Sequence, residues 1–180
     1  LMAICRTTLR QIAPLHKSPA RVLAELNRSL AGDMREGLYI TMTYAVVDSG
    51  RNQVTIARAG HELSLLSRRD PGTGSYVSEF VGSEGMPVGL VDVELFDSVI
   101  EDKTLEFFPG STLVLYTDGL TEAPNAEGKE FGGARLADAL RTGHTGSARD
   151  INSAILAAVD RFASPAALRD DYTLLTVKRA

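Results

Sequence analysis

The sequence predicts an α+β fold in which two antiparallel β-sheets pack face to face with helices on the outside. Two helical segments open the chain, a run of strand-like segments follows, and two more helical segments precede one closing strand. Grouped helices and grouped strands, without regular alternation, are typical of the α+β class. The 180 residues contain no internal repeat and no linker of altered composition. We therefore expect a single domain over residues 1–180.

The composition is that of an ordinary globular protein and argues against several functional classes. Apolar residues make up 44% of the chain and charged residues 23%, which are typical values. The formal net charge of −4 argues against nucleic acid or an acidic membrane surface as the main partner. No apolar run approaches the roughly 18 residues that span a bilayer, and we find no signal peptide. We expect a cytoplasmic protein without membrane insertion, and its single cysteine, Cys5, excludes an internal disulfide.

The first two elements are expected to be helices. A helical pattern covers residues 1–13 and ends at Pro14. Its apolar face comprises Ile4, Thr8, Leu9 and Ile12. Ser18 and Pro19 suit the N-cap and the first position of a second helix, whose apolar positions are Val22, Leu23, Leu26 and Leu30. Leu1 falls inside the first pattern with no capping residue before it, so we expect an N-terminally truncated piece of a longer protein.

The middle of the chain is expected to form an antiparallel meander. Alternating apolar and polar residues predict strands, and turn residues such as Ser49 and Gly50 separate them. The strand segments are residues 39–48, 54–58, 63–66, 76–81, 94–100 and 103–107. Arg68 and Arg69, which lie between two of these segments, are expected on the surface of a loop.

Residues 111–116 predict a strand that is buried on both faces and that leads to Asp118 and Gly119. The apolar run follows a Pro-Gly pair and contains Leu, Val, Leu and Tyr. A carboxylate at the end of a buried strand offers a hard oxygen ligand to a divalent cation. Asp-Gly is also the strongest short signal for a hairpin turn. Residues 120–125 do not alternate as a partner strand would, which weakens the hairpin alternative.

The C-terminal part predicts two helices and one closing strand. The first helix covers residues 133–140, and the residues from Ser147 to Asp150 fit a capping box at the start of the second. The second helix has an apolar face of Ile151, Ile155, Leu156, Val159 and Phe162. The closing strand covers residues 172–177.

Two aspartates, Asp170 and Asp171, directly precede this closing strand. They either share a cation with Asp118 at one edge of a sheet or form an ordinary solvated turn. The chemistry of the residues alone leaves both alternatives open.

Several motifs resemble the bacterial branch of the metal-dependent protein phosphatase family, namely the sporulation-phosphatase-like and sigma-regulator phosphatase domains. The resemblance extends from about Leu1 to Lys178, and its more specific motifs contain Asp118 and the Asp170-Asp171 pair. The matching motifs are Tyr-Thr-Asp-Gly-Leu-Thr-Glu-Ala at 116–123, Arg-Asp-Asp-Tyr-Thr-Leu-Leu at 169–175, Ala-Gly-His at 59–61, Gly-Met-Pro-Val-Gly-Leu at 85–90, and the segments 18–27 and 41–48.

The resemblance implies a two-sheet sandwich with a two-metal centre of Mn²⁺ or Mg²⁺ at one edge. Asp118 and Asp170 match ligands of one metal, and Asp171 stands where relatives have Asp or Asn. Gly119 adjoins the first of these ligands. The family motif that carries the bridging aspartate is expected just before Leu1. We therefore expect this fragment by itself to be a poor phosphatase.

The resemblance also implies an activity and partners. Two cations activate a water that attacks phosphorus directly, so no protein nucleophile is needed. The implied substrate is a phosphoserine or phosphothreonine on a regulatory protein of the anti-sigma-factor antagonist type, and an upstream sensor domain is expected in the parent chain. A catalytically inactive phosphatase fold that only binds a partner is the alternative function.

Two further residues have a functional and a structural interpretation. His61 either steers substrate or forms a hydrogen bond within a tight turn, and the second interpretation is favoured. Glu122 either orients metal-bound water or caps the turn that follows. The two opening helices are either a regulatory lever, which would also make a homodimer seam, or simply part of the core.

Overall fold

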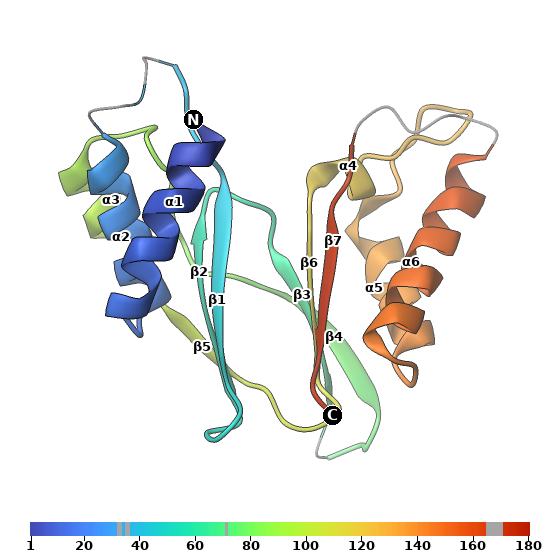
Figure 1. Ribbon diagram of the computed structural model, residues 1–180. Helices are drawn as coiled ribbons and strands as arrows, with labels where there is room; N and C mark the ends of the chain where they lie inside the picture. Colours follow the sequence, from blue (N-terminus) through green and yellow to red (C-terminus); the bar gives the residue numbers. More distant parts are fainter. Residues whose placement is uncertain (32–33, 35–36, 71, 165–170) are drawn as a thin grey trace. The chain divides into compact units, whose positions relative to one another are not determined.

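The computed structural model describes residues 1–31, 34, 37–70, 72–164 and 171–180, which form two compact units. The first unit comprises Leu1–His61 and Gly82–Glu106, and the second comprises Glu62–Val81 and Phe107–Ala180. Each unit contains one antiparallel sheet with its own helices (Figure 1). The predicted α+β class with two antiparallel sheets is thus confirmed. The packing of one sheet on the other and the single domain over 1–180 stay predictions.

The first unit is a three-stranded sheet with helices on one face (Figure 1). The sheet has the order β1-β2-β5, and both strand pairs are antiparallel. Its elements are α1 (Met2–Ile12), the 3₁₀ helix η1 (Ala13–Leu15), α2 (Pro19–Leu30), β1 (Met42–Asp48), β2 (Gln53–Ala59), α3 (Val93–Val99) and β5 (Lys103–Glu106). None of the helices in the described ranges is both long enough and apolar enough to span a bilayer.

The two opening helices form as predicted, with one change in α1. Ser18 caps α2 by accepting a hydrogen bond from the Arg21 N–H at 3.1 Å, and Pro19 occupies the first turn. In α1 the fully buried residue is Cys5, whereas Ile4 is 47% exposed. The predicted apolar face is therefore wrong at Ile4, because the helix is rotated so that Cys5 points to the core.

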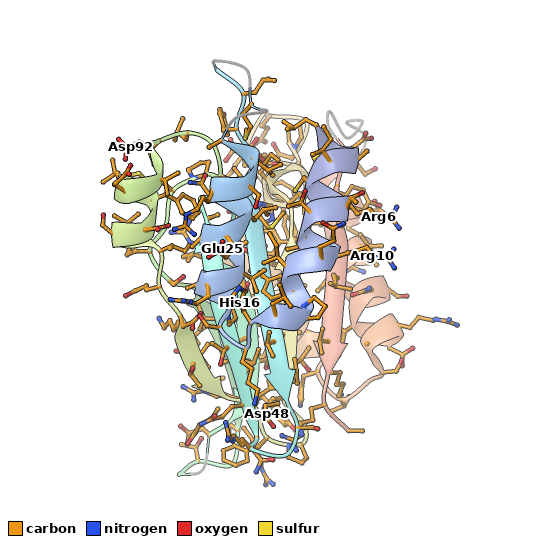
Figure 2. The ribbon with its side chains drawn as sticks, turned by 60° about the vertical axis from the view of Figure 1, so that its left-hand side comes forward. Arg6, Arg10, His16, Glu25, Asp48 and Asp92 are labelled. Carbon is orange, nitrogen blue, oxygen red and sulfur yellow. The ribbon has the colours of Figure 1, made fainter. Side chains whose placement is uncertain are left out.

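The segment 94–100, predicted as a strand, is instead the helix α3. Asp92 caps this helix by accepting a hydrogen bond from the Leu95 N–H at 2.8 Å, and Figure 2 shows Asp92 at its start. Phe96 is completely buried on its inner face. An ion pair of 2.6 Å between Arg28 and Asp97 joins α3 to α2. The cap and the buried Phe96 outweigh the strand propensity of the β-branched residues at the end of this segment.

The predicted meander is wrong after β2, because the next strand belongs to the other sheet. Gly60 adopts a left-handed φ of +65° directly after β2. A Cβ atom at this position would lie 2.4 Å from the Cγ atom of Pro87. The glycine thus lets the chain leave the first sheet while Pro87 packs against it.

The second unit is a four-stranded antiparallel sheet in the order β4-β3-β6-β7, with two long helices packed against it. Its elements are β3 (Ser64–Arg69), β4 (Tyr76–Val81), β6 (Thr112–Tyr116), α4 (Asp118–Thr121), α5 (Gly132–Gly143), α6 (Ala148–Ala163) and β7 (Leu174–Lys178). Its core includes Leu65, Val114, Leu136 and Ile155, which are all fully buried. Arg68 and Arg69 are the last residues of β3, so their predicted loop position is wrong.

The capping box of α6 is confirmed. The Ser147 Oγ accepts a hydrogen bond from the Asp150 N–H at 3.2 Å, and the Asp150 carboxylate accepts one from the Ser147 N–H at 2.8 Å. The Ser147 hydroxyl also donates to that carboxylate at 2.8 Å. The two hydrogen bonds that the Asp150 carboxylate accepts from Ser147 hold the pKa of Asp150 below its usual value of 3.8. The bond from the Ser147 hydroxyl has the larger effect.

We predict a specific pH dependence from this cap. Because the pKa of Asp150 is lower in the folded than in the unfolded state, its stabilisation is present above the unfolded pKa and is lost as the pH falls through the folded one. Asp150→Asn should lower the melting temperature at pH 7, and the difference from the unmodified chain should shrink below pH 3.8. Thermal melts from pH 7 to pH 2 check this, with Asp160→Asn on the same helix as the control. A difference that is constant with pH would contradict the prediction.

Candidate functional site

Three strands of the second sheet bring acidic residues to the same end of that sheet. β6 is antiparallel to both β3 and β7, so its C-terminal end lies beside the N-terminal ends of its two neighbours. Asp118 follows β6, Asp171 precedes β7, and Glu62 precedes β3. All three residues are exposed. We call Glu62, Asp118 and Asp171 the acidic edge.

Two hydrogen bonds between Thr117 and Thr173 hold β6 and β7 together at this edge. The Thr117 N–H donates to the Thr173 carbonyl at 3.1 Å, and the Thr173 N–H donates to the Thr117 Oγ1 at 2.8 Å. Asp118 comes directly after Thr117, and Asp171 lies two residues before Thr173. The acidic edge therefore lies at the end of a hydrogen-bonded pair of strands, β6 and β7. Of these two strands, β6 is almost entirely buried.

Asp118 is the first residue of the short helix α4, so the hairpin alternative is wrong. The chain turns into the helix through a bond from the Leu120 N–H to the Thr117 carbonyl at 3.1 Å. Leu120 is completely buried, and Gly119 is buried beside it. The Gly119 N–H donates to the Asp118 Oδ1 at 2.9 Å. The carboxylate is therefore held by its own turn and remains open to solvent.

The remaining candidate residues lie in different surroundings. Glu122 is the C-cap residue of α4, where its N–H donates to the Asp118 carbonyl at 2.8 Å, and its side chain is exposed. His61 belongs to the first unit, and its Nδ1 lies 3.2 Å from the Thr41 Oγ1. Its carbonyl accepts a hydrogen bond from the Arg58 guanidinium at 2.8 Å. The ring of His61 therefore bonds to a residue 20 positions away and not within its own turn, and both interpretations of His61 stay predictions.

Sequence reasoning missed Glu62 as a member of the acidic edge. The signal was available, because this glutamate stands just before a predicted strand, as Asp171 does. Burial raises the pKa of Tyr116, the last residue of β6, to about 12, and the negative charge of Glu62 adds to that rise. The phenol of Tyr116 is therefore neutral at physiological pH and adds no charge to the edge.

The donor chemistry at this edge fits a hard divalent cation. Its side chains offer carboxylate oxygens only, which suit Mg²⁺ and Mn²⁺ rather than softer metals. The described residues contain no group of three His, Cys, Asp or Glu side chains that would hold a metal by themselves. Asp170, the predicted second ligand, lies outside the described residues. Its convergence with Asp118 on one cation therefore stays a prediction.

Comparisons with known proteins bear on the whole chain. The family described as Stage II sporulation protein E (SpoIIE) matches residues 1–180. The chain is 31% identical over 113 residues to a protein described as phosphoserine phosphatase RsbU from Bacillus subtilis, a match that covers 61% of this chain and 30% of RsbU. A second relative, protein IcfG from Synechocystis, is 28% identical over 109 residues, which is 61% of this chain and 16% of IcfG. The chain thus spans less than a third of either curated relative.

Solved structures show the same fold. The SiaA-PP2C domain of Pseudomonas aeruginosa matches 99% of this chain and 68% of its own chain, with a TM-score of 0.78 and 23% identity. The phosphatase domain of the cell fate determinant SpoIIE from Bacillus subtilis matches 97% of this chain and 73% of its own, with a TM-score of 0.62 and 16% identity. These solved structures agree with the chain in fold, and the family match over residues 1–180 establishes that the chain belongs to the SpoIIE family.

Proposed function

We propose that the chain is the phosphatase domain of a metal-dependent enzyme that hydrolyses phosphoserine or phosphothreonine on a regulatory protein. One observation carries the proposal: Asp118 follows the buried interior strand β6 and shares that end of the sheet with Asp171 and Glu62. The relationship to RsbU, which is described as a phosphoserine phosphatase, supports phosphoserine as the substrate group. The expected protein partner is of the anti-sigma-factor antagonist type, with an upstream sensor domain in the parent protein.

The cofactor in this proposal is Mn²⁺ or Mg²⁺. Asp118 and Asp170 would hold one cation, and Asp171 would stand beside them. A SpoIIE phosphatase domain has been solved after presoaking with Mn, and the related RsbX has been solved in complex with magnesium. When bound, a pair of such cations supplies Lewis-acid activation of water and neutralises charge on the phosphoryl oxygens.

The chain's own residues supply position and charge. β6 is hydrogen-bonded to β3 on one side and to β7 on the other. This pairing fixes the position of the start of α4, and with it Asp118, relative to the sheet. The Gly119 N–H occupies one lone pair of the Asp118 Oδ1 and fixes the orientation of the carboxylate. Such preorganisation matters because a displacement of about 1 Å in a catalytic group is enough to impair turnover strongly.

One experiment distinguishes the proposed phosphatase from the alternative function, a phosphatase fold that binds a partner without hydrolysis. We expect hydrolysis of a phosphoserine peptide by the longest natural form of the protein to require Mn²⁺ or Mg²⁺ and to stop when a chelator is added. Phosphate release with and without each cation measures this. Tight binding of the phosphopeptide with no phosphate release under any cation would instead favour the binding module.

A further inference from the structure

A basic cavity lies in the second unit, away from the acidic edge. It has a volume of about 630 Å³ and is lined by Arg69, Gly74, Ser75, Tyr76, Arg141 and His144. These residues come from the β3–β4 hairpin and from the C-terminal end of α5. We call Arg69, Tyr76, Arg141 and His144 the basic pocket.

The basic pocket lies at the opposite end of β3 from the acidic edge. Glu62 stands before the first residue of this strand, and Arg69 is its last residue. At about 3.4 Å per residue, the strand places the two roughly 20 Å apart. A small ligand in the pocket therefore has no contact with Asp118.

Two guanidinium groups line this pocket with little competition for their hydrogens. The Arg69 Nε donates to the Gly74 carbonyl at 3.0 Å, and no acceptor for its terminal nitrogens is found among the described residues. The Arg141 Nη2 lies 3.4 Å from the Asp138 Oδ1, and both of these side chains are more than 60% exposed. Such an exposed pair contributes little, since water screens it. Guanidinium groups bind phosphate oxygens through paired, charge-assisted hydrogen bonds.

The other wall of the pocket is held in place by specific contacts. The His144 Nδ1 lies 2.6 Å from the Arg141 carbonyl. Because a carbonyl only accepts, the hydrogen is on Nδ1. The ring of His144 contacts the ring of Tyr76, with centroids 4.1 Å apart. Both residues are half-buried, so the ring of His144 is partly enclosed by the protein and does not lie free in solvent.

A lysine offsets the feature that would otherwise repel an anion here. The C-terminal end of a helix carries partial negative charge from its free carbonyls. The Lys178 Nζ donates to the His144 carbonyl at 2.6 Å and to the Gly146 carbonyl at 2.5 Å. The ammonium group thus covers the end of α5 and adds a positive charge close to the pocket. This concentration of cations stands out in a chain whose net charge is −4.

We propose that the basic pocket binds a phosphate group, either as inorganic phosphate or as the phosphomonoester of a phosphorylated protein segment. The two arginines would take the phosphate oxygens, and Tyr76 and His144 would form the wall beside them. This site is separate from the acidic edge, and it does not depend on the proposed hydrolytic activity.

A binding experiment with a matched charge reversal tests this proposal. Arg141 and Arg161 each lie in the last turn of a helix of the second unit, and only Arg141 lines the pocket. Inorganic phosphate, a phosphoserine peptide and its unphosphorylated form are titrated by calorimetry without divalent cations. The phosphopeptide is titrated into the Asp118→Asn variant, so that it is not consumed. The His144 ring signal, assigned with His144→Gln, is followed by NMR in parallel.

We expect saturable binding that moves the His144 signal and weakens about tenfold or more in Arg141→Glu. Arg161→Glu should change the affinity less than about twofold if the pocket is the site. Binding of inorganic phosphate would assign a small-anion site, and binding of the phosphopeptide alone would assign a phosphorylated segment. No saturation below roughly 10 mM by either probe, or equal weakening in the two arginine variants, would overturn the proposal. So would phosphate binding that disappears in Asp118→Asn.

Discussion

Asp118→Asn is expected to reduce metal-dependent phosphate release by roughly a hundredfold or more. The substitution replaces the charged carboxylate of the proposed metal ligand by a neutral amide, just after the end of β6 at the acidic edge. The Asn side chain keeps an oxygen that can accept the Gly119 N–H, and the position is exposed. The free energy of unfolding should therefore change by less than about 0.5 kcal/mol. Turnover of a phosphoserine peptide by the longest natural form of the protein, and Mn²⁺ binding by calorimetry, measure the effect.

The control is Asp138→Asn, which removes the same charge from α5 of the same unit, where the Asp138 side chain is 73% exposed. It should leave both Mn²⁺ affinity and turnover nearly unchanged. Retained Mn²⁺-dependent turnover in Asp118→Asn would contradict a metal-ligating role for this residue. Equal losses in the two variants would show a general effect of net charge rather than a role of the acidic edge.

Gly85→Ala is expected to destabilise the first unit by about 3 kcal/mol or more. A Cβ atom built at Gly85 lies 1.9 Å from the backbone carbonyl oxygen of Arg58 and 3.0 Å from the Cδ1 atom of Ile100. The loop cannot move away easily, because the Arg58 N–H donates to the Ser83 Oγ and its Nε donates to the Ser83 carbonyl, both at 3.0 Å. Chemical denaturation followed by circular dichroism measures the loss.

Gly50→Ala is the matched control for this steric effect. Neither glycine has a left-handed φ, and a Cβ atom at Gly50 comes no closer than 3.4 Å to a neighbour, the Asp48 Oδ1. It should change the free energy of unfolding by less than about 0.5 kcal/mol. A Gly85→Ala variant as stable as the Gly50→Ala variant would mean that the loop relaxes and that the close approach to β2 is not required.

Local signals in the sequence determined most of the elements and two of the three residues of the acidic edge. Ser18 with Pro19, and Ser147 with Asp150, are caps whose bonding partners lie within three residues, so each helix start follows from its own residues. The run before Asp118 predicts a buried strand because it is short, follows a Pro-Gly turn and contains Thr, Val and Tyr, which favour strands. The family motifs around Asp118 and Asp171 likewise lie within short segments, and the full-length family match agrees with them.

Only the tertiary structure decided which of these elements meet. The chain leaves the first sheet between β2 and β3 because of how Gly60 packs against Pro87, which lies 27 residues later in the sequence. The alternating pattern of the strand residues does not predict this contact. The helix α3 could not be told from a strand by sequence, because a short apolar segment suits either state until Phe96 packs into the core.

Glu62 joins Asp118 and Asp171 only through the register of β3, β6 and β7. Arg69 and Arg141 line one pocket although they are far apart in sequence, because strand pairing and helix packing are long-range contacts that no local pattern encodes.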